Sequence, residues 1–120
     1  MPNRILPLLA LGLAVSAAPA QAQLGRFCGN VNLVNITLDA RSVSDPNRPW
    51  LYVGVFGNRG GARHGVVNYS GPAGTMSQAV NRSVAFQGGT LTQVPLVQWP
   101  KHLGQPSLGD VAAGVRVECP

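Results

Sequence analysis

Ionisable and reactive side chains are scarce in this sequence of 120 residues. Charged residues make up 11% of the chain, with four carboxylates, two histidines and two cysteines in total. A hydrolase needs a nucleophile, a base and an orienting acid within reach of one another, and a glycosidase needs two facing carboxylates. Neither set stands out among so few residues, and no closely spaced pair of histidines or cysteines indicates a metal site. We therefore predict no catalytic residues, no bound metal and no cofactor.

The low charge also restricts the fold. The charged heptads of a coiled coil are missing, and the 15 glycines follow no collagen-like period. The length suffices for one small domain. Abundant glycine and proline, together with a hydrophobic content of 45%, favour short strands joined by turns.

The first 22 residues have the pattern of a secretory signal peptide. Arg4 precedes an apolar stretch over residues 5–18, and the alanine-glutamine-alanine sequence at 20–22 provides a small-x-small cleavage site. The apolar stretch is shorter than the ~20 residues that a membrane-spanning helix needs. We therefore predict cleavage near Ala22–Gln23 and a periplasmic or secreted mature chain without a membrane span.

Removal of residues 1–22 leaves a single domain, residues 23–120, with eight basic and four acidic residues, because Arg4 is the one charged residue removed. The resulting net charge of +4 favours anionic surroundings. The basic residues are scattered rather than grouped, which argues against a nucleic-acid-binding face. The partner that we expect is another protein or an anionic polymer of the cell envelope.

The two cysteines lie near opposite ends of the mature chain, at positions 28 and 119. An even number of cysteines in an exported protein is typical of disulfides. No C-x-x-C motif and no Cys–His cluster indicates redox or metal chemistry. We predict a structural disulfide between Cys28 and Cys119, which brings the first and last strands together.

Hydrophobic periodicity predicts six strands and leaves undecided whether residues 75–80 form a seventh. The six strands span residues 31–38, 50–56, 66–69, 83–87, 90–98 and 111–119. The run at 50–56 is apolar on both faces, as in a central strand. Residues 75–80 fit either a short helix that begins with a capping box or an edge strand.

Two further details concern the strands at 83–87 and 90–98. Gly88–Gly89 between them permits the positive φ of a two-residue hairpin turn. Pro95 cannot donate to a strand ladder, which places the second arm at a sheet edge or at a bulge.

The pattern as a whole predicts an all-β fold. Six or seven short strands in under 100 residues indicate a small antiparallel β-sandwich of the general immunoglobulin or transthyretin architecture, closed by one disulfide. A small closed barrel is the alternative.

The glycine-rich segment at 57–65 is the strongest candidate for binding. Glycines such as Gly60 and Gly61 allow consecutive backbone N–H groups to converge into an anion-binding nest, and Arg59, Arg63 and His64 add positive charge at its rim. The same composition also fits a mobile loop with solvated charges.

The two tryptophans are candidates for a stacking platform. Trp50 opens the most apolar strand, so we assign its side chain to the core. Trp99 stands beside Pro100 in an irregular connection and is the candidate for an exposed aromatic ring. The alternative for a tryptophan flanked by proline is a lid over the core.

These features predict an exported, non-enzymatic binding or interaction module of the bacterial periplasm or exterior. Loops on a rigid sandwich are where binding residues usually lie. The alternative is a secreted inhibitor of a hydrolase, which would present Arg63 from the 57–65 loop to a protease.

Overall fold

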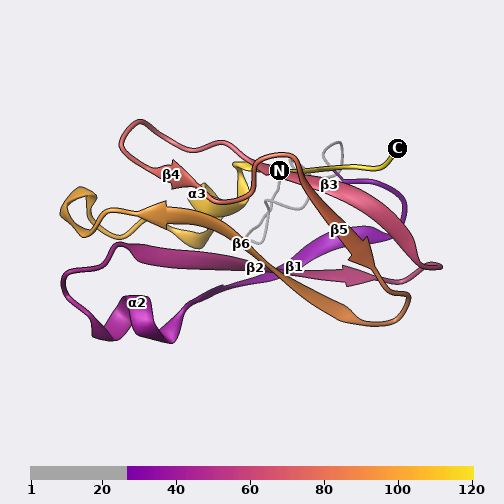
Figure 1. The fold of residues 1–120 in the computed structure, drawn as a ribbon, viewed down its shortest axis with the longest axis horizontal. Coiled ribbons are helices and arrows are strands. Elements are labelled where there is room, and N and C mark those ends of the chain that lie inside the picture. Colours follow the sequence, from indigo (N-terminus) through magenta and orange to yellow (C-terminus); the bar gives the residue numbers. More distant parts are fainter. Residues whose placement is uncertain (1–26) are drawn as a thin grey trace, which may run out of the picture.

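The part of the chain described by the computed structural model, residues 27–120, consists mainly of antiparallel strands in two sheets (Figure 1). The first sheet has the strand order β1 (Val31–Leu38), β2 (Trp50–Asn58), β6 (Leu91–Trp99) and β4 (Met76–Ser77). The second sheet has the order β5 (Arg82–Phe86), β3 (Arg63–Tyr69) and β7 (Val115–Glu118). The predicted antiparallel sandwich is confirmed, whereas the predicted signal peptide at 1–22 lies outside the described residues.

Three short helical segments complete the described part. They are α2 (Ala40–Ser44) between β1 and β2, η2 (Lys101–Leu103) after β6, and α3 (Leu108–Ala112) before β7. No helix within residues 27–120 is long and apolar enough to cross a membrane.

The strand at the centre of the first sheet is β2, which pairs with β1 on one side and with β6 on the other. Its alternate residues Tyr52 and Phe56 are fully buried, because they point between the sheets. Phe56 packs edge-on against Phe86 of the second sheet, with ring centroids 5.8 Å apart. One core cluster therefore joins both sheets.

Trp99 belongs to this core, which corrects the prediction of an exposed ring. Its relative exposure is 7%, and its ring meets that of Tyr52 edge-on at 6.5 Å. The reason is that β6 continues to Trp99, which pairs with Trp50 across the ladder, so the irregular connection begins one residue later than expected. Trp50 is half-buried against the same core.

The hairpin predicted around Gly88–Gly89 is wrong, because β5 and β6 lie in different sheets. β5 pairs with β3, and β6 pairs with β2 and β4. The residues between β5 and β6 therefore cross from one sheet to the other, and Gly89 adopts a φ of 72° there. In separate sheets, β5 and β6 can each bury apolar side chains against the opposite sheet. An isolated two-stranded hairpin has no second sheet to pack against.

Pro95 lies beside a break in the ladder between β2 and β6. The register shifts between Tyr52, which faces Val97, and Val53, which faces Pro95. The bulge expected from a proline inside a strand is confirmed, although β6 is an inner strand of its sheet.

Residues 75–80 contribute an edge strand rather than a helix. β4 consists of Met76 and Ser77, which pair with Gln98 and Val97 of β6. The backbone N–H groups of Gln78 and Ala79 then donate to the Leu96 carbonyl, which continues the edge contact.

The predicted disulfide between Cys28 and Cys119 is present, with the two Cα atoms 5.8 Å apart. Cys28 precedes β1 and Cys119 follows β7, so the bond ties the first sheet to the last strand of the second sheet.

Charge is distributed unevenly between the two sheets. The three long strands of the first sheet, β1, β2 and β6, contain no Asp, Glu, Lys, Arg or His. The Asp, Glu, Lys, Arg and His residues of the described part lie in the connections and in the second sheet. Any binding that depends on charge is therefore confined to the ends of the sandwich and to its second sheet.

The hydroxyl of Tyr69 is buried without a hydrogen-bond partner among residues 27–120. Burial raises the pKa of the Tyr69 phenol above its ordinary value of 10.0, and the negative charge of Asp110 raises it further. Because the folded-state pKa lies above the unfolded one, Tyr69 contributes stability fully below pH 10, and this stability is lost as the pH rises through the folded-state pKa.

Replacement of Tyr69 by phenylalanine removes the unpartnered hydroxyl and the ionisation together. We expect the free energy of unfolding at pH 7 to stay equal or rise by up to about 1 kcal/mol, with a smaller loss of stability above pH 10. Thermal unfolding at pH 7 and pH 10.5 measures both effects. A clear loss of stability at pH 7 would show that the hydroxyl has a partner.

Candidate functional site

A buried asparagine organises the end of the sandwich where β2 and β5 finish. Asn58 is 4% exposed, and its Nδ2 donates to the carbonyl oxygens of Gly61 (3.0 Å) and Phe86 (3.2 Å). Its Oδ1 accepts from the backbone N–H of Gly60 at 2.9 Å, and its own carbonyl accepts from Gly89 N–H at 2.8 Å. Asn58 thus fixes both connections that cross between the sheets here: its side chain holds residues 59–62, and its backbone carbonyl holds residues 87–90.

This arrangement corrects the prediction of a backbone anion nest. The N–H of Gly60 already donates to Asn58, and the N–H of Arg59 donates to the Asn30 carbonyl at 3.2 Å. Neither Gly60 nor Gly61 has a positive φ, which the alternating conformation of a nest requires. The loop is also shorter than predicted, because β3 begins at Arg63. The candidate site therefore depends on side chains.

Arg63 and His64 do lie together, on the rim of a shallow hollow of about 200 Å³. The hollow lies where β3 begins and β5 ends, and this end of both strands is on the right in Figure 1. The hollow is lined by Ala62, Arg63, His64, Ala85, Phe86 and Gln87. Because Arg63 pairs with Phe86 and His64 with Ala85, the β3–β5 ladder holds both backbones in place. Both side chains are exposed.

Glycine at position 29 leaves room for the Arg63 side chain. The Arg63 guanidinium lies in contact with Gly29, where an added Cβ would collide with it. Gly29 also has a φ of 55°, a conformation that other residues rarely adopt. The segment next to Cys28 therefore supports one of the two arginines of the candidate site.

The cations at this end are not neutralised by acidic side chains. Within residues 27–120, the single ion pair joins Arg48 Nε to Asp45 Oδ2 at 3.4 Å, at the other end of β2. Arg59, which is exposed, and Arg63 form no ion pair in the described part, and no acidic residue lines the hollow beside Arg63 and His64. The ionisable side chains that line the hollow are thus basic, although Glu118, which pairs with Val66 of β3, lies at the same end of the sandwich.

A second and larger hollow, which the sequence did not predict, lies at the opposite end of β2. It has a volume of about 390 Å³ and is lined by Pro46, Asn47, Arg48, Pro49, Pro100, Lys101 and His102. Its two walls, residues 46–49 and 100–102, are distant in sequence and meet because Trp50 pairs with Trp99. The turn at 46–49 and the residues after Trp99 were each recognisable as irregular, but their pairing was not.

The two histidines stand at opposite ends of the molecule. His64 lies where β3 begins, beside the 59–62 connection, whereas His102 follows β6 beyond the other end of β2. Within the described residues, no group of three or more His, Cys, Asp or Glu side chains is close enough to hold a metal ion.

No protein-family model, no curated protein and no solved structure matches this chain. The chemistry of the two hollows must therefore be inferred from the residues that line them.

Proposed function

We propose that this chain is an exported, non-enzymatic binding module that holds an anionic partner at the end formed by Arg59, Arg63 and His64. The observation that carries the proposal is that Arg63 and His64 line one hollow that no acidic residue lines, and that neither Arg59 nor Arg63 forms an ion pair within residues 27–120. Cations without internal partners keep their full attraction for an external anion.

Rigidity of this end supports the proposal. The hydrogen bonds of Asn58 fix the connections at 59–62 and 87–90, and the β3–β5 ladder fixes Arg63. A binding surface that is ordered before its partner arrives loses less conformational entropy on association.

The Cys28–Cys119 disulfide supports export, because disulfides persist mainly in oxidising compartments. The mature net charge and the signal-peptide pattern of residues 1–22 are consistent with a module that works among the anionic polymers of a cell envelope. Such a polymer is the partner that we favour, since its repeated charges suit the exposed side chains of Arg59 and Arg63, which stand at the two ends of the short connection between β2 and β3.

The protease-inhibitor alternative receives no such support. A substrate-like inhibitor presents its contact residue from an exposed, extended loop that enters the protease. Arg63 instead pairs with Phe86 in the β3–β5 ladder, and its guanidinium rests against Gly29. We therefore do not propose inhibition as the function.

The double substitution Arg59→Gln and Arg63→Gln tests the proposal. We expect the affinity for an anionic envelope polymer such as teichoic acid or lipopolysaccharide to fall at least tenfold, because two charge-assisted contacts are lost. The binding of the unsubstituted protein should also weaken steeply as salt rises. Isothermal titration calorimetry at two salt concentrations measures both effects.

The matched control is Arg41→Gln with Arg116→Gln, which changes the net charge equally but alters exposed residues of α2 and β7. This control should bind the polymer with nearly the original affinity. Equal losses in the two double variants would mean that overall charge, and not this end of the sandwich, determines binding.

A further inference from the structure

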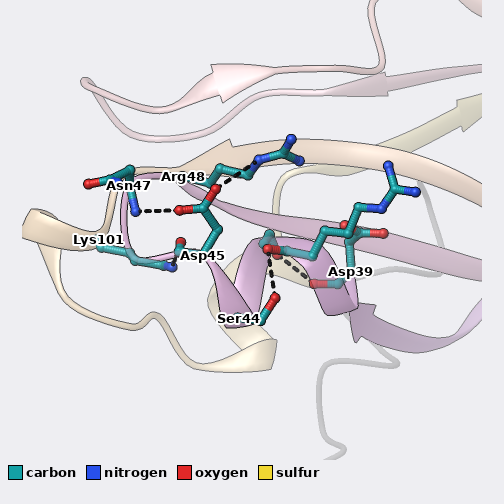
Figure 2. A network of polar contacts seen from close by, with 8 residues as sticks. Asp39, Ser44, Asp45, Asn47, Arg48 and Lys101 are labelled. Carbon is teal, nitrogen blue, oxygen red and sulfur yellow. Dashed lines mark hydrogen bonds and ion pairs between the residues drawn. The ribbon is translucent and has the colours of Figure 1, made fainter.

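The hollow at the other end of β2 has a lysine held in a fixed position (Figure 2). Lys101 Nζ donates to the Asp45 carbonyl oxygen at 2.7 Å, and it lies 5.9 Å from the centroid of the Trp50 ring. An ammonium group has three N–H donors, so two remain after the bond to Asp45. The lysine therefore presents a positioned charge with unused donors, unlike a mobile surface lysine.

The opposite wall of the hollow is fixed by Asp45. Its Oδ1 accepts from the backbone N–H of Asn47 at 2.9 Å, and its Oδ2 pairs with Arg48 Nε at 3.4 Å. Figure 2 shows these contacts grouped around the Asp45 side chain, with Lys101 approaching its backbone. The carboxylate of Asp45 is thus engaged within its own turn and does not itself line the hollow.

Two kinds of surface line the hollow. Pro46, Pro49 and Pro100 offer apolar ring faces, whereas the side chains of Asn47, Arg48, Lys101 and His102 can each donate hydrogen bonds. No Asp or Glu lines it. A ligand that suits this lining has an apolar face, several acceptor oxygens and a negative charge.

We propose that this hollow binds an acidic sugar, in which a pyranose ring lies against the prolines and its carboxylate approaches Lys101. A pyranose has a face of C–H groups that suits apolar rings, and its hydroxyl oxygens accept from the surrounding donors. The volume of about 390 Å³ falls within the range of small-molecule sites and exceeds what an isolated inorganic anion fills.

This site does not depend on the proposed function at Arg59 and Arg63. The two hollows lie beyond opposite ends of β2, whose nine residues span roughly 27 Å. No lining residue is common to both. Each site can therefore be removed by substitution without altering the other.

The test uses oxidised protein and four probes of known chemistry. They are trigalacturonate, the neutral trisaccharide maltotriose, triglutamate and inorganic phosphate. Amide chemical shifts in two-dimensional ¹H–¹⁵N NMR locate the bound probe, and titration gives its dissociation constant. We expect trigalacturonate to shift the amides of Asn47, Arg48, Lys101 and His102, and to bind at least tenfold more tightly than each of the other three probes.

Substitution of Lys101 by methionine should weaken trigalacturonate binding at least tenfold, because methionine keeps the length of the side chain without its charge. Arg48→Gln should weaken it several-fold and leaves the Lys101–Asp45 bond intact, so it serves as the test if K101M does not fold. Arg116→Gln, which alters an exposed residue of β7 that lines neither hollow, should leave the dissociation constant unchanged.

Three results would overturn the proposal. Tight binding of maltotriose would show that charge is not used, and equal binding of triglutamate or phosphate would show that the ring is not recognised. Shifts confined to Arg63 and His64 would assign the sugar to the other hollow. If R59Q/R63Q retains the polymer while K101M loses trigalacturonate, the function proposed above fails and this site stands.

Discussion

Replacement of both cysteines by alanine should lower the free energy of unfolding by roughly 4–5 kcal/mol. The Cys28–Cys119 bond joins residues separated by 91 positions, and a loop of this length greatly restricts the unfolded chain. A domain of this size has a net stability of about 5–15 kcal/mol, so the loss is a large fraction of the total. Guanidinium-induced unfolding of the oxidised protein and of Cys28→Ala/Cys119→Ala at 25 °C measures the difference.

Reduction of the unsubstituted protein provides the control, because it opens the same loop without changing the sequence. The two measurements should agree within about 1 kcal/mol, the size of an ordinary surface or packing effect. If both the double variant and the reduced protein lose less than about 1 kcal/mol, the unfolded chain is already compact when the disulfide is absent. Binding of an anionic polymer should weaken as well, since Gly29, next to Cys28, contacts Arg63.

Substitution of Asn58 by alanine should cost about 3 kcal/mol of stability, the second large effect that we expect. The side chain makes three hydrogen bonds, and their loss leaves the carbonyl of Phe86 buried without this donor. Chemical denaturation measures the stability. Hydrogen exchange at Gly60 reports locally, because its N–H donates to Asn58 Oδ1 and should exchange much faster in the variant.

Asn47→Ala is the control, because the Asn47 side chain is exposed and its backbone N–H, which meets Asp45, is retained. Its effect should remain below about 0.5 kcal/mol. Two outcomes would contradict our account of Asn58: equal stability of N58A and the unsubstituted protein, or unchanged exchange at Gly60.

The parts of the fold that local pattern determines could be predicted from the sequence. Residues 31–38 and the run beginning at Trp50 form the strands β1 and β2, because alternation and continuous apolar runs directly reflect which faces are buried. The disulfide was predictable for a different reason. Two cysteines in a chain whose first residues have the pattern of an export signal leave one intramolecular pairing.

Pairing between distant segments could not be read in the same way. A Gly–Gly pair between two apolar arms predicts a hairpin, yet a positive φ at Gly89 serves a crossing between sheets equally well. Trp99 is buried because β6 extends by one more residue than predicted, so that Trp99 pairs with Trp50. The ends of strands are the part of a fold that sequence patterns predict least well.

The candidate sites were predictable to different degrees. Arg59, Arg63 and His64 were recognisable as a local concentration of positive charge. The hydrogen bonds from Asn58 to the backbone of the neighbouring residues 59–62 could not be predicted, because a buried asparagine and an exposed one are indistinguishable in sequence. The hollow at Lys101 combines two turns that strand register alone brings together.

The absence of Asp, Glu, Lys, Arg and His from β1, β2 and β6 has a consequence for how the fold responds to the surrounding medium. Below the pH at which tyrosine ionises, nothing in these strands gains or loses a proton. Acidification or a change in salinity therefore acts on the connections and on the second sheet, which include the two binding sites that we propose. The sheet between them keeps its shape while the surrounding medium fluctuates.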